Sequence, residues 1–115
     1  MLPIKNRLKK KKDFEKVLKE GKKVKWDGLV LKYYPNSLGE SRFGIIVSKK
    51  VSKKAVVRNR IKRRIREILR RELEKIKEGQ DIVFFVSPEI KDKEFFEIQE
   101  TVIKLLKKGK LLKNG

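Results

Sequence analysis

The sequence contains no cysteine and no histidine among its 115 residues. The absence of cysteine excludes a disulfide framework and a thiolate metal site. The absence of histidine removes the commonest general base and the commonest ligand of transition metals. Acid–base chemistry would therefore fall to carboxylates or lysines. We expect no catalytic residue and no metal-ligating motif in this chain.

The sequence also has no apolar run near the ~20 residues that a membrane-spanning helix needs. Its basic N-terminal segment is not followed by the apolar core of a signal peptide. We therefore expect a cytoplasmic protein with no membrane partner, and nothing in the sequence implies a protein partner. At 115 residues, the chain has the size of one domain with a modest core.

Negative charge is scarce, because 15 Asp and Glu residues accompany 34 Lys and Arg residues and leave a formal net charge of +19. This excess repels itself in the folded state, and a polyanionic partner would offset the repulsion. A thermophile-type surface of ion pairs would explain the 43% charged content, but it needs both signs in similar number. The imbalance therefore indicates a nucleic-acid partner.

The positive charge is most concentrated between Arg58 and Arg71, where eight Arg or Lys residues accompany one Glu. The periodicity predicts an amphipathic helix over about 55–77. Its expected apolar stripe is Ile61, Ile65, Ile68, Leu69, Leu73 and Ile76. Its expected cationic stripe is Asn59, Arg63, Arg66 and Arg70, flanked by Arg60, Arg64 and Arg71. A solvated face is the simpler alternative, but guanidinium groups in a row match the phosphates of nucleic acid.

Two kinds of uncharged side chain are further candidates for RNA contacts. Asn59 either caps the helix or contacts a base edge or a sugar hydroxyl with its amide. Aromatic rings stack on unpaired bases, although each ring taken singly is more often part of a core. The candidates for stacking are Phe14, Trp26, Tyr33 and Tyr34.

The remaining segments predict one mixed α/β domain over residues 1–115, with 1–7 and 110–115 flexible. We expect helices at about 9–20, 55–77 and 92–108, and strands at 24–34, 42–48 and 81–86. The short connection between the first two strands contains Gly39 and predicts that they pair as a hairpin. The strand–helix–strand order that follows predicts that the last strand runs parallel to its predecessor.

Four motifs, taken in order, closely resemble those of the bacterial ribonuclease P protein family. They are Asn6-Arg7-Leu8-Lys9-Lys10, Asp13-Phe14, Val47-Ser48-Lys49-Lys50 and Arg58-Asn59-Arg60-Ile61-Lys62-Arg63. The resemblance extends from about Asn6 to Leu106. It implies an α/β (α+β) two-layer sandwich of order α-β-β(-β)-α-β-α with a left-handed β-α-β crossover. Because such crossovers are generally right-handed, this handedness rests on the resemblance alone.

The resemblance implies a protein subunit of ribonuclease P, in which a catalytic RNA removes the 5′ leader of precursor tRNA with Mg²⁺. The protein would bind no cofactor alone, and Mg²⁺ would act in the holoenzyme. The catalytic RNA would contact Arg58, Asn59, Arg60, Lys62 and Arg63, with Lys53 and Lys54. The leader would lie in a cleft lined by Phe14, Leu18, Val30 and Lys32, with Ser48, Lys49, Lys50 and Arg66 reaching its backbone. Family members often carry an aromatic residue in place of Leu18 and of Lys32, so stacking is expected to be weaker here.

Two other functions are consistent with parts of the sequence. One is a ribosomal or other structural RNA-binding protein without a role in tRNA processing. The other is a self-sufficient nuclease that uses Glu94, Glu97 and Glu100, which are spaced three apart. Surface pairing with neighbouring lysines is the simpler explanation of that spacing.

Overall fold

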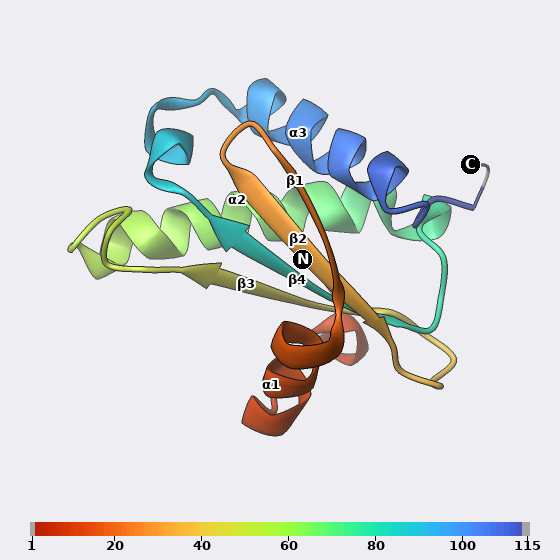
Figure 1. The fold of residues 1–115 in the computed structure, drawn as a ribbon. Coiled ribbons are helices and arrows are strands. Elements are labelled where there is room, and N and C mark those ends of the chain that lie inside the picture. The colour runs from red at the N-terminus through yellow and green to blue at the C-terminus, as the bar shows by residue number, and fades with distance from the viewer. Residues whose placement is uncertain (1, 114–115) are drawn as a thin grey trace.

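The computed structural model describes residues 2–113 and contains one four-stranded sheet with three helices (Figure 1). The elements in chain order are α1 (Lys11–Glu20), β1 (Lys22–Trp26), β2 (Leu29–Pro35), β3 (Arg42–Val47), α2 (Ala55–Glu72), β4 (Gln80–Val86) and α3 (Phe95–Lys108). Short 3-10 segments lie at Ile4–Asn6, Leu73–Lys75 and Pro88–Asp92. No helix in this described part is long and apolar enough to cross a bilayer.

Alternation along the strands places apolar side chains on both faces of the sheet. Leu31 and Phe84 belong to the main core, which α2 and α3 cover, whereas Val83 belongs to a smaller cluster with α1. The sheet and the α2–α3 pair thus form the two layers of the predicted sandwich. α1 packs on the opposite face and covers only one end of it (Figure 1).

The predicted pairing of the first two strands is wrong in two respects. The segment expected to be one strand at 24–34 is a hairpin of β1 and β2, which turns at Asp27 and Gly28 with φ values of 42° and 90°. An Asp-Gly pair favours such a turn because both positions need positive φ. In addition, β4 lies between β2 and β3, in the order β1-β2-β4-β3. β4 is apolar on both faces, so it takes an inner position, where helices can pack on either side of it.

The connection from β3 through α2 to β4 joins two parallel strands, as predicted. In Figure 1 both strands run from right to left, α2 passes behind the sheet and β4 lies above β3. This arrangement makes the crossover left-handed, in agreement with the resemblance and against the general rule.

The structure places the described parts of the two segments that were predicted to be flexible, 1–7 and 110–115, against the rest of the domain. Leu2 and Leu111 are buried in the main core, and the Leu8 N–H donates to the Phe43 carbonyl at 2.8 Å. At the other end, the Lys77 N–H donates to the Leu111 carbonyl at 2.7 Å. These contacts hold the N-terminal end to β3 and the C-terminal end to the segment between α2 and β4. Residues 1, 114 and 115 lie outside the described residues.

Candidate nucleic-acid interface

The helix α2 ends at Glu72 and not near residue 77, so it buries four members of the predicted apolar stripe, and Leu73 and Ile76 lie beyond its end. Ile65, Ile68 and Leu69 are fully buried in the main core. Most of this helical face packs against β3 and α3. The opposite face, which carries Asn59, Arg60 and Arg63, is exposed. The sequence pattern therefore predicted correctly which face of α2 points outward.

The cationic stripe is shorter than predicted because of one carboxylate. Glu67 accepts hydrogen bonds from Arg70 Nη2 at 2.7 Å and from Arg71 Nε at 3.3 Å. The hydrogen bond from Arg70 is the main cause that lowers the pKa of Glu67 to about 2. Arg70 and Arg71 are thus neutralised in part. The i,i+3 and i,i+4 spacing of these residues was a signal in the sequence for this pairing.

Arg58 supports the segment before α2 with its own side chain. Its Nη1 donates to the carbonyls of Ser52 at 2.9 Å and Lys53 at 3.0 Å. Lys54 is the N-terminal boundary residue of the helix, so the alternative that Asn59 caps α2 is wrong. We define the α2 surface as the exposed residues Lys53, Lys54, Asn59, Arg60 and Arg63. Lys62 and Arg58 border it and are half-buried.

The face of the sheet that carries α1 is left uncovered at its other end. There the register aligns one residue from each strand, because Lys25 pairs with Val30, Val30 with Phe85, and Phe85 with Ile46. Directly opposed residues point to the same side of a sheet. Val30, Ile46 and Phe85 are half-buried and Lys25 is exposed. We call these four residues the open row.

α1 borders the open row and is seated directly on the sheet. A Cβ atom at Gly44 would lie 2.4 Å from Phe14 Cε1, so the Phe14 ring rests on the backbone of β3. Lys32 Nζ donates to the Leu18 carbonyl at 2.9 Å. The structure thus brings Phe14, Leu18, Val30 and Lys32 to one face, as the resemblance implied. One of the N–H donors of Lys32 is therefore occupied by the C-terminal turn of α1.

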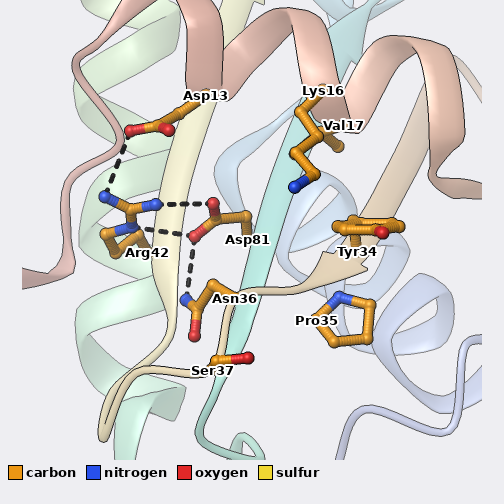
Figure 2. Close-up of a pocket in the computed structure, with 9 residues that line it drawn as sticks. All are labelled: Asp13, Lys16, Val17, Tyr34, Pro35, Asn36, Ser37, Arg42 and Asp81. Carbon is orange, nitrogen blue, oxygen red and sulfur yellow. Dashed lines mark hydrogen bonds and ion pairs between the residues drawn. The ribbon is translucent and has the colours of Figure 1, made fainter.

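An ion-pair network anchors the first turns of α1 to the sheet (Figure 2). Arg42 donates to both carboxylate oxygens of Asp81, at 2.8 and 2.7 Å, and to Asp13 at 3.3 Å. Asn36 adds a bond from Nδ2 to Asp81 at 2.9 Å. The Asp81 hydrogen bond is the main cause that raises the pKa of Arg42. These groups line a pocket of 380 Å³ that also includes Lys16 and Tyr34.

The other predicted leader contacts lie apart from Phe14. Ser48, Lys49 and Lys50 are exposed just beyond the end of β3. Arg66 is on α2, which covers the opposite face of the sheet, and it lines a pocket together with Arg7. The prediction that Arg66 belongs to the same cleft as Phe14 is therefore not supported by its position.

The aromatic candidates are divided among three places. Tyr34 lies beside α1 with Lys16 Nζ 5.5 Å from its ring centre. Tyr33 packs against the main core. Trp26 is exposed, and Lys104 Nζ lies 3.7 Å from its ring centre. Phe85, which the sequence analysis did not single out, is the aromatic residue of the open row. The only signal for Phe85 in the sequence is that it follows Phe84, because successive side chains of a strand point to opposite faces of the sheet.

Two of the three carboxylates proposed for a self-sufficient nuclease, Glu94 and Glu97, have a structural role. Glu94 and Glu97 form a capping box at the start of α3, in which the Glu94 N–H donates to Glu97 Oε1 at 3.0 Å. Such a box satisfies N–H groups that the helix leaves without partners. Among residues 2–113, no group of three or more acidic side chains is placed to hold a metal ion.

The fold and the surface together define a class: a small, strongly basic α+β domain with one cationic helix and a partly open sheet. The ribonuclease P family model matches residues 2–110. A ribonuclease P protein component from a Pseudanabaena species is 40% identical over 113 residues, which are 97% of each chain. That of Pelotomaculum thermopropionicum is 38% identical and covers 90% of this chain and 92% of its own length.

Solved structures agree with this match. The RNase P protein of Staphylococcus aureus superposes with a TM-score of 0.85 at 34% identity, over 92% of this chain and 96% of that chain. The Thermotoga maritima protein gives 0.82 at 35% identity, over 89% and 96%. The chain belongs to the ribonuclease P protein family, and it is the protein component of that ribonucleoprotein endoribonuclease of tRNA processing. Its partner is accordingly the ribonuclease P RNA. Nothing in these comparisons supports a ribosomal or other structural role.

Proposed function

We propose that the chain binds the catalytic RNA through the α2 surface and the 5′ leader of precursor tRNA along the open row. The observation that carries this proposal is the separation of the two surfaces. α2 covers one face of the sheet, and the open row lies on the other. One small protein can therefore contact the catalyst and the substrate at the same time.

The α2 surface suits a folded, highly charged RNA. Arg60, Arg63, Lys53 and Lys54 are exposed, and the helix holds the two arginines at fixed spacing. Guanidinium groups donate two parallel hydrogen bonds to phosphate oxygens. Asn59 lies between these cations and supplies an amide for a base edge or a sugar hydroxyl. Arg58 and Lys62 contribute positive charge at its border.

The open row suits an unpaired strand. Phe85 and Val30 present apolar surface, while Lys25 supplies positive charge at one end. Single strands bind without strong sequence preference when bases stack on aromatic rings and phosphates meet cations. Phe14 and Leu18 limit the row at α1, and Lys49 and Lys50 extend the positive charge beyond β3. We propose that the leader follows this path.

The chemistry belongs to the RNA in this proposal. Mg²⁺ would be held in the holoenzyme and would serve the cleavage reaction, and this chain would contribute no ligand to it. The support is the resemblance to ribonuclease P proteins. We propose that the holoenzyme acts in the cytoplasm, where precursor tRNA is processed.

The function is tested by adding the purified chain to the catalytic RNA and a precursor tRNA at low Mg²⁺. We expect stimulated release of the 5′ leader, because the protein raises the affinity for the substrate. The chain alone should release none. No stimulation across a range of Mg²⁺ concentrations would contradict the proposal. Cleavage by the chain alone that Glu94→Gln abolishes would favour the nuclease instead.

The leader path is tested by Phe85→Leu, which keeps apolar bulk but removes the ring. We expect about a tenfold loss of holoenzyme affinity for precursor tRNA, since stacking contributes roughly 1–3 kcal/mol per base. Affinity for mature tRNA, which lacks the leader, should not change. Phe96→Leu is the matched control, because Phe96 is exposed on α3. Equal losses for precursor and mature tRNA would exclude a leader contact at Phe85.

A further inference from the structure

The N-terminal segment brings a third arginine to the side of α2. A pocket of 290 Å³ is lined by Leu2, Arg7, Arg63, Arg66 and Glu67. Three of these five residues carry a guanidinium group. Leu2 is buried, so the pocket has an apolar base with positive charge around it.

Arg7 is held in place from several directions. It forms a parallel bridge with Phe43 at the free edge of β3. Its Nε donates to the Leu2 carbonyl at 2.9 Å. The preceding residue, Asn6, is buried and donates from Nδ2 to the Ser41 carbonyl at 2.8 Å. The Nη groups of Arg7 have no hydrogen-bond partner among residues 2–113, so they are available to a ligand, and the held backbone loses little freedom when one binds.

The positive charge in this pocket has little compensation. Glu67 lines the pocket, but its two oxygens accept hydrogen bonds from Arg70 and Arg71. Among the ion pairs of residues 2–113, none within 4.0 Å involves the three pocket arginines. Burial, and after it the positive charge of Arg7, lowers the pKa of Arg66. Like charges that share a partly desolvated site favour an anion between them.

We propose that Arg7, Arg63 and Arg66 form a binding pocket for one backbone phosphate of the catalytic RNA. This inference rests on the proposed function, because the RNA supplies the phosphate. A guanidinium fork matches phosphate geometry better than an ammonium group does. The free edge of β3 lies between the two faces of the sheet. A phosphate bound there anchors the RNA next to the α2 surface, at the boundary with the leader side.

The experiment compares Arg7→Gln with Lys9→Gln, which removes the same charge from an exposed position on the same segment. The first measurement is the midpoint of thermal unfolding with increasing inorganic phosphate at constant ionic strength. We expect phosphate to raise the midpoint of the unmodified protein and of Lys9→Gln, and to raise that of Arg7→Gln much less. The second measurement is the affinity for the catalytic RNA alone. We expect about a tenfold loss for Arg7→Gln, equivalent to about 1.4 kcal/mol, and less than threefold for Lys9→Gln.

Arg7→Lys keeps the positive charge but removes the planar guanidinium group. Its RNA affinity should lie between that of Arg7→Gln and that of the unmodified protein. Equal behaviour of Arg7→Gln and Lys9→Gln in both measurements would overturn the proposal. If Arg7→Gln loses the phosphate response but keeps its RNA affinity, the pocket binds free phosphate and the proposed RNA contact is overturned. If Arg7→Gln loses RNA affinity but keeps the phosphate response, the proposal that one pocket binds both is overturned. If Arg60→Gln leaves RNA affinity unchanged, the proposed α2 surface fails, whereas the phosphate response still tests the pocket.

Discussion

Replacing Arg42 by methionine is expected to lower the free energy of unfolding by about 3 kcal/mol, because breaking one side of a buried ion pair leaves the other charge uncompensated. Asp81 would be that charge, since its side chain is only 9% exposed and Arg42 binds both of its oxygens. Urea denaturation followed by circular dichroism measures the loss. The slope of the unfolding free energy against urea should stay unchanged if the native fold is kept.

Two further variants identify the cause of this loss. Asp13→Asn removes only the 3.3 Å contact, and we expect it to cost less than about 1 kcal/mol, as for a partly exposed pair. Adding Asp81→Asn to Arg42→Met should recover part of the stability, because the buried charge disappears. An Arg42→Met protein that loses less than Asp13→Asn would show that the network in Figure 2 contributes little.

The double variant Arg60→Gln/Arg63→Gln is expected to weaken binding of the catalytic RNA by about a hundredfold at low salt, which is about 2.7 kcal/mol. Both side chains are exposed on α2, so the fold should remain. Each lost phosphate contact removes roughly 0.7–0.9 from the slope of log affinity against log salt. We expect the unmodified protein to have a slope steeper than about −3 and the variant a slope shallower by about 1.5. Filter binding over a range of KCl concentrations gives both quantities.

The matched control is Lys91→Gln/Lys107→Gln, which removes the same charge from two exposed lysines outside α2. It should change RNA affinity only slightly, through the net charge. Equal losses in the two double variants would mean that overall charge, and not the α2 surface, determines binding. A loss of helical content in Arg60→Gln/Arg63→Gln would show that these arginines stabilise the fold.

The sequence predicted best those features that depend on local periodicity. Ile61, Ile65 and Ile68 recur at helical spacing, so the buried and exposed faces of α2 could be predicted without coordinates. The apolar run at 81–86 likewise predicted a strand, which the structure contains as β4. Periodicity placed Arg60 and Phe14 on helices, as the structure has them, and the family motifs implied their roles. None of these inferences needed knowledge of a distant contact.

Strand order could not be predicted in the same way. The Asp27-Gly28 pair is a turn signal, but the β-forming residues on both sides of it predict one continuous strand where the structure has β1 and β2. β3 pairs with β4 and not with β2. That choice depends on how all the strands and helices together bury apolar surface, which is a property of the whole sheet. Phe85 was missed for a related reason, because a continuous apolar strand does not indicate which of its alternating side chains stays uncovered.

The sequence by itself determined that this protein is a basic α/β domain with an arginine-rich amphipathic helix, because charge and periodicity are local properties of the chain. Only the tertiary structure decided which arginines from separate segments come together. The pairing of Arg70 and Arg71 with Glu67 lies within one helix and follows from sequence spacing, whereas only folding brings Arg7 from the N-terminal segment to Arg66. The electrostatic state of a guanidinium group depends on neighbours within a few ångströms, and folding chooses those neighbours.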